Sequence, residues 1–230
     1  MNSDEMKRLA AAEAVKLVEP EMTLGLGTGS TAAHFVDLLG ERVRAGLSVR
    51  GIPTSDDTRR RALAAGIEII EPDETTVIDL AVDGTDEVDL RLNLIKGGGG
   101  ALLREKIIAS AAKRFVVIAD KTKKVAELGH FPLPVEIDPF SYGLTVKRIR
   151  NAIEGQGLPG RLRLRPGKEG APFISDGGHY IIDCSLERIH DPAALERALV
   201  SIAGVVETGL FIGMTEMVIL AGPDGIEILK

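Results

Sequence analysis

The stretch Met22-Thr23-Leu24-Gly25-Leu26-Gly27-Thr28-Gly29-Ser30-Thr31 joins a short apolar run to a glycine-rich turn. We expect residues 22–26 to form a strand and residues 31–39 to form the helix that follows. Glycine allows positive φ angles and a close approach of the backbone to a ligand. The start of a helix offers unpaired N–H groups and a positive dipole end, which suit a phosphate. The stretch therefore predicts an α/β fold with an anion-binding turn, and an ordinary tight turn is the simpler alternative.

Strand-like and helix-like segments alternate on both sides of this stretch. The expected helices cover residues 4–18, 56–65 and 101–114, and the expected strands cover residues 47–52, 67–70, 77–82 and 115–119. Ser55 is expected to cap the helix that follows it, because a short side-chain oxygen accepts from first-turn N–H groups. Alternation with continuous apolar strands is typical of a mostly parallel sheet that is covered on both faces.

The pattern changes after residue 130, where Phe131-Pro132-Leu133-Pro134 and Asp138-Pro139 predict an extended connector. The expected elements beyond it are a helix at 144–154, strands at 161–165 and 180–184, a helix at 192–202, and strands at 205–211, 216–220 and 226–229. We expect the chain to return to the first sheet from Val205 onward. The prediction is α/β: a Rossmann-like, mostly parallel sheet domain over 1–130 plus 204–230, with a smaller inserted α+β domain over 131–203.

The composition is that of an ordinary globular protein and narrows the classes of function. The net charge of −6 argues against a general nucleic-acid-binding surface, and no uncharged stretch is long enough to span a membrane. Aromatic residues make up 3% of the 230 residues, against 26 glycines, which favours a small polar ligand. The one cysteine, Cys184, excludes an intrachain disulfide, and its apolar surroundings indicate a buried strand thiol. We expect a cytoplasmic protein.

Two further motifs follow expected strands. Val82-Asp83-Gly84-Thr85-Asp86-Glu87 lies at a strand end, where the carboxyl ends of parallel strands form the ligand crevice. Its carboxylates can accept hydrogen bonds from sugar hydroxyls or relay protons. A solvated acidic turn is the alternative. Lys96 then leads into Gly97-Gly98-Gly99-Gly100, an entropically costly run that suggests a backbone bent around a ligand. Glu105, early in the next helix, is a candidate base, because partial burial raises a carboxyl pKa. A flexible loop followed by a surface glutamate is the alternative.

Charged residues elsewhere carry weaker signals. Lys123 belongs to Lys121-Thr122-Lys123-Lys124, which can bind a phosphate as a point charge, although a solvated turn is favoured when the cluster is taken alone. Arg161, Arg163 and Arg165 alternate with leucines and are expected on the solvated face of a strand. A metal site would draw on Asp83, Asp86, Glu87 and Asp89, but their spacing fits no calcium loop and no histidine cluster supports a transition metal. We expect no metal and no cofactor.

The ordered motifs GLGTGSTA, VDGTDEVD, IKGGGGALLREKIIAS and FPLPVE resemble those of the type A ribose-5-phosphate isomerases. The resemblance covers nearly the whole chain. It implies a metal-free isomerase that interconverts D-ribose 5-phosphate and D-ribulose 5-phosphate through an enediolate, in the non-oxidative pentose phosphate pathway. It also implies a sugar-phosphate substrate and a homodimer or higher homo-oligomer. Thr85 and Gly100 depart from the family, in which alanine is common at both positions.

The resemblance also implies roles for individual residues. By the resemblance, Glu105 is the proton-transferring base. From the chemistry of the reaction we add two catalytic candidates: Lys96 as the fixed positive group for the developing oxyanion, and Asp83 for proton movement between O1 and O2. The substrate-binding residues that it implies are Thr28, Gly29, Ser30, Thr31, Asp83, Gly84, Thr85, Asp86, Lys96, Gly97, Gly98, Gly99 and Lys123. The division of roles between Asp83 and Asp86 stays open.

Three other functions are compatible with single motifs. Gly27-x-Gly29-x-x-Ala32 matches a relaxed dinucleotide fingerprint, but the second strand lacks the acidic residue at its end that a nicotinamide-dependent dehydrogenase needs. A non-catalytic sugar-phosphate sensor would keep the anion-binding turn and would not need Glu105. An amino-sugar phosphate deaminase of related architecture would use the same turn on a different substrate.

Overall fold

The computed structural model describes residues 1–230, and the chain forms two compact units. Unit 1 contains residues 1–85, 104–123 and 214–230, and unit 2 contains residues 86–103 and 124–213. The sequence of unit 1 is therefore interrupted at two places by the two segments that form unit 2. The domain boundaries expected above, 1–130 plus 204–230 and 131–203, stay a prediction, because compactness alone does not define a domain that folds independently.

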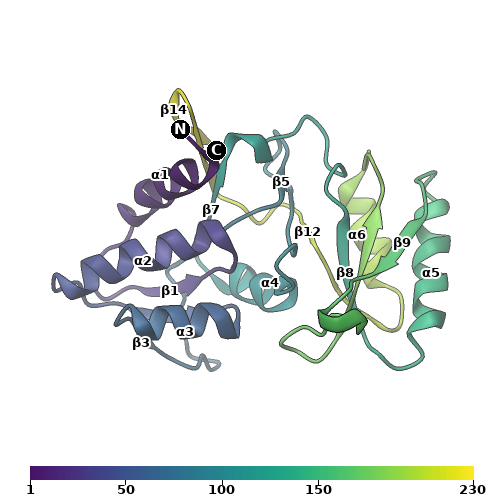
Figure 1. Cartoon of the computed structure of the whole chain (residues 1–230), viewed down its shortest axis with the longest axis horizontal. Helices are drawn as coiled ribbons and strands as arrows, with labels where there is room; N and C mark the ends of the chain where they lie inside the picture. The colour runs from purple at the N-terminus through teal and green to yellow at the C-terminus, as the bar shows by residue number, and fades with distance from the viewer. The chain divides into compact units, whose positions relative to one another are not determined.

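Unit 1 is built on one sheet. Its strands are β1 (Thr23–Leu26), β2 (Arg50–Pro53), β3 (Glu68–Ile69), β4 (Leu80–Asp83), β7 (Phe115–Asp120), β13 (Met217–Gly222) and β14 (Gly225–Leu229). They lie in the order β14-β13-β7-β4-β1-β2-β3 (Figure 1). All neighbours run parallel except β13 and β14, which form a hairpin around Pro223-Asp224. The expected mostly parallel α/β fold is confirmed.

Helices cover both faces of this sheet. They are α1 (Ser3–Val15), α2 (Ser30–Arg44), α3 (Asp56–Ala64) and α4 (Leu102–Ala111), and a single 3₁₀ turn, η1 (Lys121–Lys123), follows β7. Leu24 and Leu26 share a buried cluster with Phe35 of α2, so this face of β1 lies under α2. Gly25 points the other way, because side chains alternate along a strand, and a Cβ there would meet Ile108 of α4 at 2.4 Å. Ser55 accepts from the Thr58 N–H at 3.1 Å, which confirms the expected cap of α3.

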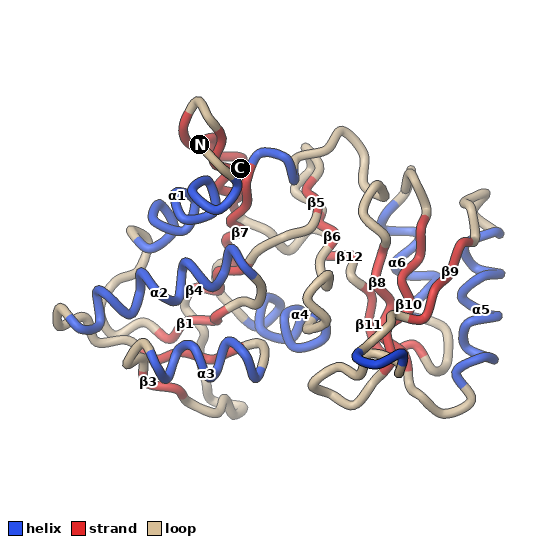
Figure 2. The backbone as a smooth tube through the Cα atoms, viewed as in Figure 1, coloured by secondary structure: helices blue, strands red, loops and turns tan.

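Unit 2 contains two antiparallel sheets and two helices. Its strands are β5 (Glu87–Val88), β6 (Leu94–Ile95), β8 (Leu133–Ile137), β9 (Arg161–Leu164), β10 (Tyr180–Ser185), β11 (Val205–Thr208) and β12 (Leu210–Phe211), and its helices are α5 (Tyr142–Glu154) and α6 (Pro192–Val200), with a 3₁₀ turn, η2, at Lys168–Gly170. One sheet has the order β11-β8-β10-β9 and the other β12-β6-β5 (Figure 2). No helix of the chain combines the length and the apolar composition needed to cross a membrane.

Two sequence expectations for this region are wrong. The proposed connector contains β8, a buried strand in the interior of the four-stranded sheet, although Pro134 supplies no N–H to the ladder. The sheet accommodates Pro134 because its carbonyl still accepts from the Gly209 N–H at 2.8 Å. Residues 205–211 do not return to the first sheet either, since β11 pairs with β8 and β12 with β6. The return occurs at β13.

Candidate active site

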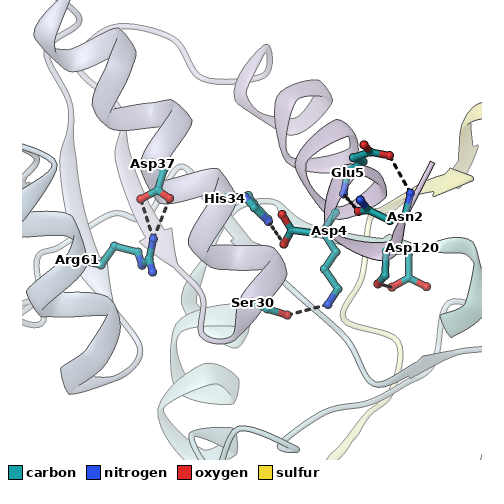
Figure 3. A network of polar contacts seen from close by, with 10 residues as sticks. Asn2, Asp4, Glu5, Ser30, His34, Asp37, Arg61 and Asp120 are labelled. Carbon is teal, nitrogen blue, oxygen red and sulfur yellow. Dashed lines mark hydrogen bonds and ion pairs between the residues drawn. The ribbon is translucent and has the colours of Figure 1, made fainter.

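The turn after β1 is shaped for an anion. Gly29, at φ +100°, is the N-cap of α2, and no side chain caps the first turn of that helix. The N–H groups there are therefore available to a ligand that accepts hydrogen bonds. Ser30 is exposed at this end of α2. Its hydroxyl accepts a hydrogen bond from the Lys7 ammonium at 3.1 Å, drawn as the dashed line at Ser30 in Figure 3. The positive charge of α1 thus adds to the positive end of the α2 dipole.

Asp83 ties the loop after β4 to the turn after β1. Its Oδ1 accepts from the backbone N–H of Thr28 at 3.0 Å and of Gly84 at 2.7 Å, and the residue is 3% exposed. A Cβ at Gly27 would lie 2.2 Å from the Asp83 carboxyl carbon, so only glycine fits there. Gly84 in turn packs near Thr31. The first two predicted motifs therefore meet at the ends of neighbouring parallel strands, where such folds bind ligands.

A hydroxyl cluster holds this turn from the other side. Thr28 Oγ1 lies 2.7 Å from Thr54 Oγ1, and Thr58 Oγ1 donates to the carbonyl of Gly27 at 2.9 Å. Thr54 and Thr58 are both buried, and each of these contacts joins the turn to the start of α3. The side chain of Thr28 is consequently fixed before any ligand binds.

Glu105 lies in the first turn of α4 and is 4% exposed. It stands one turn before Ile108, which packs against Gly25 of β1. Residues three apart share a helix face, so Glu105 belongs to the face of α4 that covers the sheet. A buried carboxylate is rare unless it is paired or used in chemistry, and this one sits near the favourable end of a helix dipole.

Lys123, the last residue of η1, is half-buried in unit 1. The preceding turn is held by Asp120, which accepts from the N–H of Thr122 at 3.1 Å and from its hydroxyl. Lys121 packs its aliphatic chain close to Gly222 of β13. The cluster is thus an ordered turn with distinct environments for its lysines, and not a uniformly solvated run.

Lys96 lies at the end of β6 in unit 2 and is 2% exposed. Its N–H donates to the carbonyl of Gly209 at 2.8 Å, and its ammonium stands 5.4 Å from the centre of the Phe211 ring. A buried cation of this kind keeps a fixed position.

The glycine run after Lys96 adopts a backbone that only glycine accepts easily. Gly97 and Gly100 have φ angles of +101° and +82°. Gly98 donates its N–H to Asp86 Oδ2 at 2.8 Å, and a Cβ at Gly98 would stand 2.7 Å from the same carboxylate. Gly98 and Gly99 are exposed, while Asp86 and Thr85 are half-buried. The structure therefore brings Asp86 to the glycine run.

The remaining acidic residues of the second motif support the backbone. Glu87 accepts from the N–H groups of Gly129 at 2.7 Å and Phe131 at 2.6 Å. Asp89 accepts from the N–H groups of Arg91 and Asn93. No group of three or more histidine, cysteine or carboxylate side chains is arranged to hold a metal ion.

Other predictions concern residues outside these loops. Cys184 is fully buried, as expected, and burial raises the pKa of its thiol. His34 pairs with Asp4 at 2.9 Å, between α2 and α1 (Figure 3). Sequence reasoning missed Lys7 and Arg165. Lys7 is a single lysine in an amphipathic helix, so nothing in the sequence marked it as a site residue. Arg165 alternates with leucines, and this pattern predicted a side chain that faces solvent.

The fold and these loops define the class of protein: an α/β enzyme whose Rossmann-like sheet carries an anion-binding turn after its first strand. The family model of ribose 5-phosphate isomerase A (phosphoriboisomerase A) matches residues 50–225. A ribose-5-phosphate isomerase A of Rhodopseudomonas palustris strain BisB18 is 56% identical over 100% of this chain and 99% of its own length.

Solved structures agree with this match. A D-ribose-5-phosphate isomerase in complex with phospho-erythronic acid is 41% identical, with a TM-score of 0.94 over 100% of both chains. The ribose 5-phosphate isomerase A of Methanocaldococcus jannaschii is also 41% identical, with a TM-score of 0.91 over 99% of both chains. The chain belongs to the ribose 5-phosphate isomerase A family. It interconverts ribose 5-phosphate and ribulose 5-phosphate, a step of the pentose phosphate pathway, and this activity replaces the three alternatives that the motifs left open.

Proposed function

We propose that the chain isomerises its sugar phosphate by a single-base proton transfer through a cis-enediolate, with Glu105 as the base. The reaction moves a proton between C2 and C1, and one carboxylate can remove it and return it. The observation that carries the proposal is the burial of Glu105, 4% exposed in the first turn of α4, directly after the glycine run. A positioned base contributes about 10²–10⁴-fold to the rate.

We propose that Lys96 stabilises the negative charge that develops on the enediolate. Its ammonium is buried and held near Phe211, and a fixed cation of this kind stabilises charge that forms in the transition state. Asp83 would move a proton between O1 and O2 and help to open the furanose ring. Asp86 would orient substrate hydroxyls. The rigid hydrogen bonds of Asp83 to Thr28 and Gly84 favour a fixed orientation of that carboxylate.

The phosphate is proposed to bind at the start of α2. Thr28, Gly29, Ser30 and Thr31 offer backbone N–H groups and hydroxyls there, and Lys7 adds charge beside Ser30. Gly84, Thr85, Gly97, Gly98 and Gly99 are proposed to contact the rest of the substrate through their backbone, and Lys123 through its ammonium. The phospho-erythronic acid of the solved relative carries a phosphate and a carboxylate, and we expect this chain to bind it as well.

Isotope exchange tests the mechanism. The enzyme is incubated with ribose 5-phosphate in D₂O, and the label at the C1 and C2 positions is followed by NMR. Proton transfer through a solvent-exchanging base incorporates deuterium at these carbons during turnover. Isomerisation with no deuterium incorporation at any stage would favour a direct hydride shift and remove the enediolate.

We also propose that the chain assembles as a homodimer or higher homo-oligomer. Phe140, two residues before α5, and Leu144, in the first turn of α5, are 84% and 69% exposed, and exposed apolar surface can mark association sites. Sedimentation of the wild type and of a Phe140→Ser variant measures the assembly.

We further propose a cytoplasmic location, supported by a fold that uses no disulfide.

A further inference from the structure

Arg165, directly after β9, is enclosed although its sequence pattern predicted a solvated side chain. Its side chain is 12% exposed, whereas Arg161 and Arg163 of the same strand are exposed. The expectation is wrong for Arg165 because a carboxylate, two backbone carbonyls and a ring surround its guanidinium. The carboxylate and the carbonyls satisfy the N–H groups that burial would otherwise leave without partners.

Asp183 of β10 orients this guanidinium. Arg165 Nε donates to Asp183 Oδ2 at 3.0 Å, and Nη2 donates to Oδ1 at 2.5 Å. A two-point pair between an arginine and a carboxylate fixes direction as well as position, because the guanidinium is planar. The ring of Phe173 lies below it, 5.8 Å from the guanidinium carbon.

The third nitrogen of Arg165 reaches the glycine run. Nη1 donates to the carbonyl of Gly97 at 2.8 Å and approaches that of Gly98 at 3.3 Å. In a trans peptide the C=O and the N–H point in opposite directions, and the N–H that belongs to the Gly97 carbonyl is that of Gly98. This N–H donates to Asp86 Oδ2 at 2.8 Å. One peptide unit is therefore held by a cation at its oxygen and by a carboxylate at its nitrogen.

This arrangement couples the two charges. A cation at the carbonyl oxygen polarises the peptide and strengthens the N–H as a donor, since hydrogen bonds in a chain reinforce one another. Asp86 is consequently restrained by a hydrogen bond whose strength and direction depend on Arg165. The backbone supplies one further restraint, because the Gly100 N–H also donates to the Gly97 carbonyl at 3.0 Å. Gly97, Gly98 and Gly99 have no side chains to limit the motion of the run, so the contact from Arg165 adds to this turn.

The segment that follows Arg165 restrains the same run at a second point. Phe173 donates its N–H to the Arg165 carbonyl at 2.9 Å, and a Cβ at Gly100 would meet the Phe173 ring at 2.4 Å. Gly100 also has a φ angle of +82°, so both its backbone and its surroundings favour glycine.

We propose that Arg165 is a positioning residue that acts on the substrate through Asp86, along the path Asp183, Arg165, the Gly97–Gly98 peptide and Asp86. The inference rests on the proposed role of Asp86 in orienting substrate hydroxyls. Arg165 has no direct role in the reaction under this proposal, so its removal should matter only while Asp86 is present.

A double-mutant cycle tests this dependence. Arg165→Met and Asp86→Ala are made singly and together, and kcat and KM are measured with ribose 5-phosphate. We expect Arg165→Met to lower kcat/KM about 30-fold in the wild type and about threefold or less in the Asp86→Ala background. Arg165→Lys, which keeps the charge but cannot bind Asp183 and Gly97 together, should fall between the wild type and Arg165→Met. Arg161→Met, on the same strand and exposed, is the matched control and should leave kcat/KM unchanged.

Thermal unfolding of each variant separates positioning from a loss of folding. If Arg165→Met lowers kcat/KM by the same factor in the wild type and in the Asp86→Ala background, the path through Asp86 is wrong. It is also wrong if Arg165→Met leaves kcat/KM unchanged. If Arg165→Met does not fold, Arg165→Lys takes its place in the same cycle with the same criterion. If Asp86→Ala leaves kcat/KM unchanged, both the role proposed for Asp86 and this inference are wrong. If Asp86→Ala lowers kcat/KM but the effects of the Arg165 and Asp86 substitutions are additive, only this inference is wrong.

Discussion

Asp83 at the end of β4 accepts a hydrogen bond from the backbone N–H of Thr28 at 3.0 Å, although the two residues are 55 positions apart in the chain. They meet because β1 and β4 are parallel neighbours in register, with Leu26 opposite Val82. The strand ends therefore deliver an anion-binding turn and a buried carboxylate to the same edge of the sheet. This edge is where the order of the strands reverses, as in other α/β enzymes that bind phosphorylated ligands.

Glu105→Gln should abolish nearly all turnover while leaving KM within a few-fold. The amide keeps the volume of the side chain but cannot accept the substrate proton, so we expect kcat to fall by about 10²–10⁴-fold. Steady-state kinetics and deuterium incorporation from D₂O measure the loss. The exposed Glu41→Gln is the control and should behave as the wild type. Near-normal exchange in Glu105→Gln would move the base role elsewhere, with Asp83 as the next candidate.

Lys96→Ala and Lys123→Ala should affect different kinetic constants. Lys96 is proposed to stabilise charge that exists only in the transition state, so its loss should mainly lower kcat. Lys123 is proposed to bind a group that does not change during the reaction, so its loss should raise KM about tenfold, or about 1.4 kcal/mol. Binding of phospho-erythronic acid by calorimetry gives a second measurement at Lys123. The reverse pattern, with KM damage at Lys96 and kcat damage at Lys123, would exchange the two assignments.

Activity should survive exhaustive treatment with a chelator. Among the acidic residues of the second motif, Glu87 and Asp89 bind backbone N–H groups, which leaves them poorly placed to share a cation. The rate of ribose 5-phosphate conversion is measured before and after dialysis against EDTA, with metal content followed by mass spectrometry. A large loss that Mg²⁺ or Mn²⁺ restores would contradict a metal-free mechanism.

Gly27→Ala should damage both stability and activity. The new Cβ would stand 2.2 Å from the carboxyl carbon of Asp83, so Asp83 and its bond to Thr28 must shift. Overpacking of this kind costs about 1–3 kcal/mol, and we expect kcat/KM to fall along with it. Gly143→Ala in α5 is the control, because a Cβ there meets nothing within 4 Å. Denaturant unfolding and kinetics measure the two effects, and an unchanged kcat/KM in Gly27→Ala would show that the Asp83 orientation is not needed.

Asp79→Asn should lower stability at neutral pH and have no effect in acid. A hydrogen bond from the Thr23 N–H, and next one from Lys113, holds the pKa of the Asp79 carboxyl below its ordinary value of 3.8. Since the folded pKa is the lower one, ionised Asp79 stabilises the fold at pH values above the unfolded pKa. This contribution is lost as the pH falls through the folded pKa.

We expect a difference of about 1 kcal/mol in the free energy of unfolding near pH 7, vanishing once the pH lies below the folded pKa. Urea unfolding at a series of pH values measures it, with the exposed Glu74→Gln as the control. A difference that stays constant down to the lowest pH would assign the effect to packing instead of charge.

Short-range rules accounted for much of unit 1. The apolar run of β1, the glycine turn after it and the Ser55 cap depend on residues that are close in the chain, so each is visible in a short window. The hairpin at Pro223-Asp224 is local in the same way. The order of the four motifs also identified the family, because the motifs and their order are read directly from the sequence.

Long-range contacts decided the rest. Leu133–Ile137 became a buried strand because β10 and β11 supply partners from distant parts of the chain, which outweigh the missing N–H of Pro134. Arg165 is enclosed because Asp183 and the carbonyl of Gly97 come to it from other elements. Lys7 reaches Ser30 because α1 packs on α2. Local propensity acts over a few residues, whereas burial of a charge or of a strand depends on which distant partners satisfy it, and only the folded chain brings those partners together.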